Sequence, residues 1–143
     1  MLSLLNKQKV FSEEETALLA LNFSNELMPG DVIILNGNLG AGKTFFIRQA
    51  LKNLGIDNVS SPTFAIVNEY KGKFKIYHFD FYRLTGSAEL FDIGFNDYLN
   101  DDEAVTFIEW GNLIPGVLPR RRLEINIIVV SDFSREFIFE KYE

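Results

Sequence analysis

The spacing of apolar residues predicts a strand, a loop and a helix in direct succession in the first half of the chain. Residues 32–35 are apolar without interruption, which is typical of a strand buried on both faces of a sheet. Residues 44–54 carry apolar side chains at helical spacing, and Gly55 is placed to end that helix. The segment between them is rich in glycine, so we expect a tight turn from the strand into the helix.

Another helix is predicted near the start of the chain. Ser12 and Glu15 have the S-x-x-E spacing of a capping box, which marks the beginning of a helix. Pro29 and Gly30 then break the helical pattern. The apolar stripe of this helix is expected to contain Ala17, Leu18 and Leu21, with Leu27 as a further member.

The rest of the chain is dominated by strands and turns. Lys71 and Gly72 separate two strand-like runs and predict an antiparallel hairpin, and a second hairpin closes the chain. A short helix is expected to open at Gly86 and Ser87. The further strands are expected at residues 64–70, 74–79, 104–108, 123–130 and 136–141. With few helices and several hairpins, the sheet should be mixed rather than purely parallel.

Composition favours a folded domain without disulfides. Hydrophobic residues make up 47% of the 143 positions, enough for a substantial core, and the 14 phenylalanines should be buried in that core or in an interface. The absence of cysteine excludes disulfides, thiolate zinc sites and cysteine nucleophiles. No apolar run reaches the roughly 18 residues of a membrane span, and we see no secretory signal, so the cytoplasm is the expected compartment.

The net charge of −6 argues against autonomous binding to nucleic acid. Twenty acidic residues outnumber fourteen basic ones, so the chain as a whole repels a phosphate backbone. The run of arginines at 120–122 is the one place where RNA or an acidic partner could dock, although a solvated edge is the more usual role of such a run.

The clearest motif is GNLGAGKT, which runs from Gly37 to Thr44 and matches the phosphate-loop pattern G-x-x-x-x-G-K-[ST]. Glycines let successive N–H groups point at phosphate oxygens, Lys43 can reach the β- and γ-phosphates, and the Thr44 hydroxyl can bind Mg²⁺. The expected cofactors are therefore ATP or ADP and Mg²⁺. The loop residues expected to contact them are Gly37, Leu39, Gly40, Ala41, Gly42, Lys43 and Thr44. We predict an α/β fold of the P-loop NTPase type, in three layers with a mixed parallel and antiparallel sheet, and residues 1–143 as a single P-loop ATPase domain.

Two acidic residues complete the predicted catalytic set. Asp80 and Glu109 each follow a mostly apolar strand, so each should emerge at a carboxyl end, where ligands bind in open α/β sheets. Phosphate-loop enzymes use such residues to hold magnesium or to orient water. We therefore expect Lys43, Asp80 and Glu109 to be catalytic, and Thr44, Glu109 and Asp80 to bind the metal. The alternative for either acid is a strand-end carboxylate that faces water. Because both should lie at strand ends, we expect replacement of either by alanine to leave little cavity and a near-wild-type melting temperature, and to impair turnover more than folding.

Several nearby residues leave alternatives open. Thr63 could sense the γ-phosphate through magnesium, or could be an ordinary turn residue after a proline. Arg83 could neutralise phosphoryl charge, although a salt bridge is the favoured interpretation. A neutral, packed role is favoured for His78, the only histidine, and a core or rim position for Trp110.

Taken together, these motifs resemble the TsaE/YjeE family of small bacterial phosphate-loop ATPases. The resemblance runs in order and with compatible spacing over residues 12–119. The segments that carry it are GNLGAGKT from Gly37, SPTF from Ser61, YHFDFYRL from Tyr77, ELFDIGFNDYL from Glu89 and FIEWGN from Phe107.

The resemblance implies a function in tRNA modification. Family members serve threonylcarbamoylation of the adenosine next to the anticodon in tRNAs that read ANN codons, together with TsaB and TsaD, and TsaD carries the transfer chemistry. The expected partners are thus TsaB-like and TsaD-like proteins, with tRNA reached only through the complex, no membrane contact, and a monomer when isolated. By matching positions, Thr44 and Glu109 would hold magnesium, Asp80 would support hydrolysis and Thr63 would be switch-like. Thr16 matches a family threonine near the nucleotide base.

Two other functional classes are compatible with a phosphate loop. A small-molecule or nucleotide kinase would need a lid with phosphate-clamping arginines, whereas the loop helix here is followed by hairpins. A nucleotide-gated binding module without catalysis would not need Asp80 and Glu109, both of which are present. Assays of phosphoryl transfer and of turnover distinguish these classes from an ATPase subunit.

Overall fold

A computed structural model describes residues 6–62 and 65–143, and in this part of the chain seven strands form one sheet in the order β1-β7-β6-β2-β5-β4-β3. The strands are β1 (Lys7–Val10), β2 (Val32–Asn36), β3 (Val67–Lys71), β4 (Lys75–Asp80), β5 (Ala104–Glu109), β6 (Arg122–Val129) and β7 (Arg135–Tyr142). The helices are α1 (Glu13–Ser24), α2 (Lys43–Lys52), α3 (Ser87–Asp92) and α4 (Phe95–Leu99), followed by 3₁₀ turns at Gly111–Leu113 and Pro115–Val117. None of these helices is long and apolar enough to cross a membrane.

The sheet is mixed, as the sequence predicts. Strand β2 lies at its centre and runs parallel to both neighbours, β5 and β6, and β4 is parallel to β5. The pairs β3–β4, β6–β7 and β1–β7 are antiparallel. Parallel pairing in the centre brings the carboxyl ends of β2, β4 and β5 to one edge of the sheet, directly before the loops that carry the candidate site.

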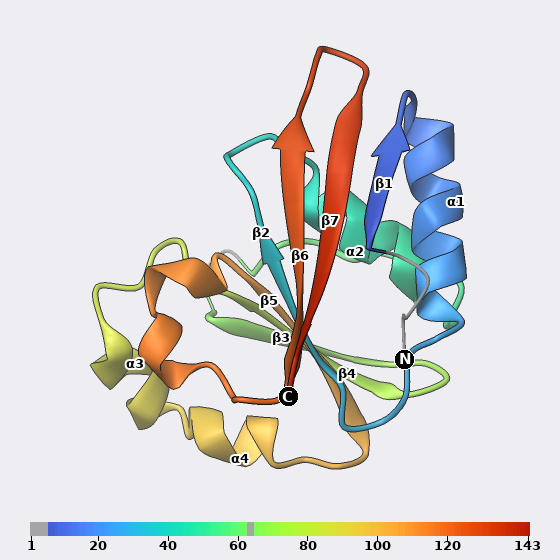
Figure 1. Cartoon of the computed structure of the whole chain (residues 1–143). Helices are drawn as coiled ribbons and strands as arrows, with labels where there is room; N and C mark the ends of the chain where they lie inside the picture. Colours follow the sequence, from blue (N-terminus) through green and yellow to red (C-terminus); the bar gives the residue numbers. More distant parts are fainter. Residues whose placement is uncertain (1–5, 63–64) are drawn as a thin grey trace.

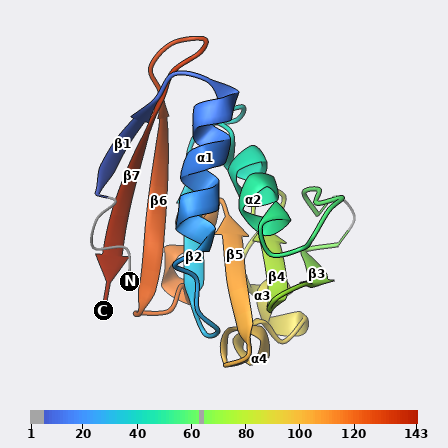
Figure 2. The same cartoon turned by 90° about the vertical axis from the view of Figure 1, so that its right-hand side faces the viewer.

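Helices cover the two faces of the sheet unequally. The longer helices α1 and α2 lie on one face, and the short helices α3 and α4 lie on the other (Figures 1 and 2). The first layer buries rings such as Phe23, Phe46 and Phe137, and the second is built around Phe79 and Phe95. This arrangement confirms the predicted three-layer α/β fold. Phenylalanines fill both cores as expected, and among the described residues Phe11, Phe91 and Phe133 are exposed at the surface.

The start of the first helix is predicted correctly and Leu27 is buried as expected, but the predicted apolar stripe is wrong at Leu18 and Leu21. Ser12 caps α1 by accepting the N–H of Glu15 at 3.1 Å. Leu18 and Leu21, however, are 58% and 38% exposed. The buried face consists of Thr16, Leu19, Ala20, Phe23 and Ser24. The segment from 17 to 23 is apolar at most positions, so its spacing alone does not define which face meets the sheet.

Both predicted hairpins are present, and one strand was not predicted. β3 begins at Val67, and the expected start of that strand at residue 64 lies outside the described residues. β1 pairs with β7 at the sheet edge, in a register that joins Lys7 to Ile138. Its sequence, KQKV, is too short and too polar to show strand alternation, because one of its faces is exposed.

Asp101, just before β5, is held by three donors. The Lys75 ammonium lies 2.8 Å and the Tyr77 hydroxyl 2.6 Å from its Oδ2, and the Glu103 N–H donates to its Oδ1. These contacts, led by the bond from Lys75, lower the pKa of Asp101 from 3.8 to about 2. Because the folded-state pKa is the lower one, the ionised carboxylate stabilises the fold above about pH 4, and this contribution is lost as the pH falls towards 2.

Replacing Asp101 by asparagine should therefore lower the urea midpoint at neutral pH. The difference from the wild type should shrink as the pH falls below about 4, where the wild-type carboxylate also loses its advantage. Urea titrations at a series of pH values measure this, with Asp102→Asn, at an exposed neighbour, as the control. A difference that stays constant over the series would show that ionisation of Asp101 does not stabilise the fold.

Candidate functional site

The glycine-rich loop leaves β2 and enters α2 by way of two left-handed backbone positions. Gly40 has a φ of +79° and Gly42 a φ of +107°, a region that side chains with a Cβ rarely adopt. Gly42 is the N-cap of α2 and offers no side-chain hydrogen bond to the helix. The N–H groups of the first helical turn therefore remain available to an anion.

The side chain of Lys43 folds back over its own loop. Its Nζ donates to the carbonyl oxygens of Gly37 at 2.6 Å and Asn38 at 3.0 Å, and lies 4.2 Å from the centre of the Trp110 ring. Lys43 is only 5% exposed. Burial lowers the pKa of its ammonium, while the carboxylates of Glu109 and Asp80 act in the opposite direction.

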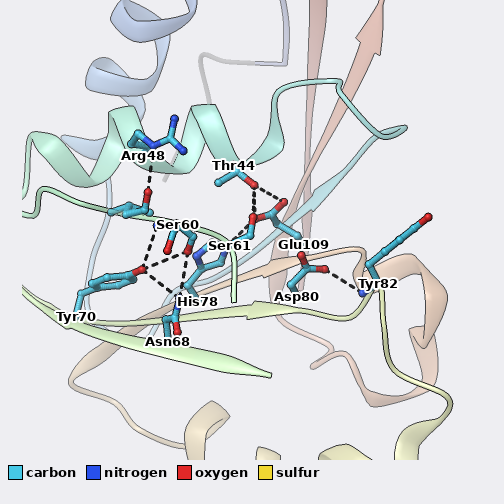
Figure 3. Close-up of polar contacts among 11 residues, drawn as sticks. Thr44, Arg48, Ser60, Ser61, Asn68, Tyr70, His78, Asp80, Tyr82 and Glu109 are labelled. Carbon is cyan, nitrogen blue, oxygen red and sulfur yellow. Dashed lines mark hydrogen bonds and ion pairs between the residues drawn. The ribbon is translucent and has the colours of Figure 1, made fainter. Parts of the chain in front are cut away.

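The two predicted acids lie side by side at the end of neighbouring strands. Asp80 ends β4 and Glu109 ends β5, and the parallel register pairs them directly. The Thr44 hydroxyl lies 2.9 Å from each carboxylate oxygen of Glu109 (Figure 3). The hydroxyl of Thr44 and the carboxylates of Asp80 and Glu109 thus lie together at one edge of the sheet.

Two further side chains of this cluster were not identified as partners by the sequence. The Ser61 hydroxyl lies 2.8 Å from that of Thr44. His78 is fully buried, which confirms a packed role, and its Nε2 lies 2.6 Å from Oε2 of Glu109. Strand alternation offered one signal, because His78 stands two residues before Asp80 and so shares its face of β4.

The acids differ in how they meet solvent. Asp80 is half-buried and accepts the N–H of Tyr82 at 2.9 Å, and burial is the main cause that raises the pKa of its carboxyl. Glu109 is 3% exposed and bonded on two sides. A water-facing carboxylate is therefore wrong for Glu109. Its replacement by alanine would leave the buried imidazole of His78 and the partly buried hydroxyl of Thr44 without this partner.

A cleft of about 560 Å³ joins these groups. The predicted site residues that line it are Leu39, Gly40, Gly42, Lys43, Thr44, Asp80 and Glu109, together with Ser61, Arg83 and Trp110. Gly37 contributes through its carbonyl oxygen, which accepts from Lys43. Trp110 packs at the edge of the core beneath α3 and α4, in agreement with a core or rim position.

Thr16 lies apart from the carboxylates. It lines a second cleft of about 270 Å³ on the other side of the loop, with Ala41 and Phe133, and its hydroxyl donates to the Ser12 carbonyl oxygen at 3.2 Å. Gly40 and Gly42 line both clefts, so the loop forms the wall between them. Thr63 lies outside the described residues.

The oxygen atoms of Thr44, Glu109 and Asp80 suit a magnesium ion that is also held by water and phosphate, rather than a metal ion held by protein side chains alone. Among the described residues, no cluster of three or more histidine and acidic side chains is arranged to hold a metal ion. Thr44, Glu109 and Asp80 instead offer one hydroxyl and two carboxylates. Mg²⁺ prefers oxygen ligands and usually takes its remaining positions from water and substrate phosphates, so this donor set fits it.

Comparisons with known proteins agree with the motifs. Residues 10–137 match the family model described as threonylcarbamoyl adenosine biosynthesis protein TsaE. A protein of Rickettsia bellii named tRNA threonylcarbamoyladenosine biosynthesis protein TsaE is 39% identical over 138 residues, 94% of each chain. A protein of the same name in Bacillus subtilis is 40% identical over 135 residues, which cover 93% of this chain and 84% of the relative.

The fold is also similar to that of a solved structure. The crystal structure of Bacillus subtilis YdiB superposes with a TM-score of 0.82 at 34% identity, and the match covers 96% of this chain and 85% of that one. The family model spans the described sheet from the last residue of β1 to the first residues of β7. The chain belongs to the family of threonylcarbamoyl adenosine biosynthesis protein TsaE.

Proposed function

We propose that this chain binds ATP with Mg²⁺ and hydrolyses it as a subunit of the assembly that makes threonylcarbamoyladenosine in tRNA. Its partners there are TsaB-like and TsaD-like proteins, and tRNA is reached through them. The relatives named for this biosynthesis support the pathway, and the site supports the chemistry. It works in the cytoplasm.

One observation carries the chemical part of the proposal. The hydroxyl of Thr44, which follows the phosphate-loop lysine, lies 2.9 Å from both oxygens of Glu109, and Asp80 is the register partner of Glu109. Segments from three separate parts of the sequence therefore meet in one cleft. This arrangement is expected for a phosphate loop that binds a nucleotide with a metal ion, and an ordinary glycine-rich turn would not require it.

The residues of the cleft divide the work of phosphate binding. The N–H groups of residues 40–44 and the N-terminus of α2 would receive the phosphate oxygens. The Lys43 ammonium would exchange its bonds to the carbonyl oxygens of Gly37 and Asn38 for bonds to phosphate, which is charge-assisted on both sides. Because Lys43 already lines this cleft, its ammonium could bind phosphate without a large movement of the side chain.

Thr44 and Glu109 would hold magnesium, with Asp80 beside them. When bound there, the ion would supply positive charge to neutralise the charge that develops on the phosphate oxygens. His78 donates from Nε2 to Glu109 and holds this carboxylate towards the Thr44 hydroxyl. Asp80 would orient water for attack, since it is only half-buried and lies at the cleft surface.

Exchanging Glu109 for glutamine tests the proposal. The amide keeps the size of the side chain but is a weaker magnesium ligand. The gain in ATP affinity on adding Mg²⁺ should therefore be about ten- to a hundredfold smaller than in the wild type. Calorimetric ATP titrations at several Mg²⁺ concentrations measure it. Asp80→Asn is the matched variant, which should lose hydrolysis while it keeps most of the affinity for ATP.

These variants also define what would refute the proposal. The melting temperature of each should stay close to that of the wild type, which excludes unfolding as the cause. If Glu109→Gln bound ATP with unchanged magnesium dependence, Glu109 would not be a metal ligand. Substrate-dependent phosphoryl transfer by the wild type would instead support a kinase.

A further inference from the structure

The closing hairpin reaches back to the phosphate loop through one arginine. The Nε of Arg135, the first residue of β7, donates to the carbonyl oxygen of Ala41 at 3.1 Å, across 94 positions of sequence. Its Nη1 lies 2.9 Å from the carbonyl oxygen of Ser131 and 3.0 Å from that of Ser134. The guanidinium thus joins the backbone of the phosphate loop to the backbone of the β6–β7 turn.

The turn that holds Arg135 is itself ordered by hydrogen bonds. The hydroxyls of Ser131 and Ser134 lie 2.6 Å apart, and the N–H of Val130 donates to the carbonyl oxygen of Ser134 at 3.1 Å. β6 pairs with β7 up to Val129 and Arg135, directly below the turn. Strand pairing therefore fixes the backbone of Arg135, and from this position its side chain contacts the carbonyl oxygen of Ala41.

Within the described part of the chain, no ion pair neutralises the charge of Arg135. Among the described residues, the ion pairs include none with Arg135, and its acceptors are the backbone carbonyls of the turn and of Ala41. Asp132 and Glu13 line the same second cleft, but their carboxylates form no ion pair with the guanidinium. A positive charge thus remains behind a loop that is expected to bind a polyanion.

The contact with Ala41 fixes a peptide that matters for phosphate binding. In a trans peptide the C=O and the following N–H point in opposite directions. With the Ala41 carbonyl held towards Arg135 in the second cleft, the N–H of Gly42 points away from it, and Gly42 also lines the cleft of Lys43 and Glu109. Because Gly42 is a glycine at a φ of +107°, the unrestrained peptide could rotate at little steric cost.

From these contacts we infer that Arg135 is a positioning residue of the phosphate loop. It holds the Ala41–Gly42 peptide with its N–H towards the phosphate site before nucleotide arrives. This inference rests on the function proposed above, and it places in the closing hairpin a determinant of affinity that lies outside the loop motif. A preorganised loop binds phosphate more tightly, because its ordering cost is already met in the free protein.

The experiment compares Arg135→Gln, Arg135→Lys and the wild type in two assays. Amide hydrogen exchange of the nucleotide-free protein reports whether the loop is held, and titrations with ATP and with inorganic tripolyphosphate, each with Mg²⁺, report phosphate affinity. Arg48→Gln is the matched control, since Arg48 is partly buried on α2 and donates from Nε to the Val59 carbonyl oxygen at 3.1 Å (Figure 3). All titrations are made well below the melting temperatures.

We expect exchange in residues 40–44 to be faster in Arg135→Gln, with Kd raised about tenfold for both ligands. Arg135→Lys should recover part of the loss, and Arg48→Gln should leave the loop unchanged. A loss for ATP with none for tripolyphosphate would overturn the inference, because it would indicate contact with the nucleoside. Unchanged exchange would also overturn it. If the wild type bound neither ligand, the proposed function would fall, and the exchange data would still decide whether Arg135 holds the loop.

Discussion

Adding TsaB-like and TsaD-like proteins should raise ATP hydrolysis by this chain by about 10³–10⁵-fold, the gain that an arginine supplied by a partner gives in related phosphoryl transfers. The cleft holds Lys43, Thr44 and two carboxylates, but the side chains at its rim are exposed. Leu39 is 67% and Tyr82 is 47% accessible to solvent. A site that is open in this way binds nucleotide yet leaves water free around the γ-phosphate.

Hydrolysis depends on how well water and charge are positioned, so an open site should be slow by itself. Positioning and fixed charge supply most of the rate in phosphoryl transfer, and both improve when water is excluded. A protein that covered Leu39 and Tyr82 would exclude water and could add a cation. Because the chain has a net charge of −6, tRNA without proteins is a poor candidate for covering the site.

Phosphate release should be measured for the chain alone, with tRNA, and with both partner proteins. Glu109→Gln is the control, because the partners should not stimulate a chain whose metal site is impaired. Fast turnover by the chain alone, or strong stimulation by tRNA without proteins, would defeat the prediction. Either result would instead favour the kinase interpretation.

Replacing Lys43 by alanine should weaken ATP binding by roughly ten- to two-hundred-fold. This range follows from about 1.5–3 kcal/mol for one charge-assisted hydrogen bond. In the free protein the ammonium is bonded to the carbonyl oxygens of Gly37 and Asn38. Binding of Lys43 to phosphate therefore breaks these two hydrogen bonds and gains less free energy than a wholly new contact. We accordingly expect the loss of ATP affinity to fall in the lower half of the range.

Titration with a fluorescent ATP analogue measures this loss. Lys52→Ala is the control, since Lys52 is an exposed lysine at the other end of α2. The fluorescence of Trp110, the only tryptophan, gives a second readout, because the Lys43 ammonium lies 4.2 Å from the centre of its ring. Unchanged affinity in Lys43→Ala would refute the phosphate-loop assignment.

Local sequence signals were sufficient where one pattern determined one structure. The apolar run of β2, the glycine-rich loop and the spacing of α2 predicted a unit that the structure contains within one or two residues. The same holds for the positions of Asp80 and Glu109, which end neighbouring parallel strands as predicted. Their pairing needed only the parallel order of β4 and β5.

Contacts between distant segments could not be predicted in this way. The buried face of α1 depends on the sheet beneath it, and apolar residues on both sides of the helix leave the choice to tertiary packing. The contact of His78 with Glu109 spans 31 positions and that of Arg135 with Ala41 spans 94. Each depends on strand register, which no single segment specifies.

The role of ATP bound at the phosphate loop can be measured in the tRNA modification reaction itself. In a reaction that contains TsaB-like and TsaD-like proteins, tRNA and all other components, the amount of threonylcarbamoyladenosine formed should be measured with the wild-type chain, with Lys43→Ala and with no added chain. We predict repeated rounds of modification with the wild type, and with Lys43→Ala only the level reached without the chain. Equal modification by wild type and Lys43→Ala would contradict the claim that ATP bound at this loop drives the reaction.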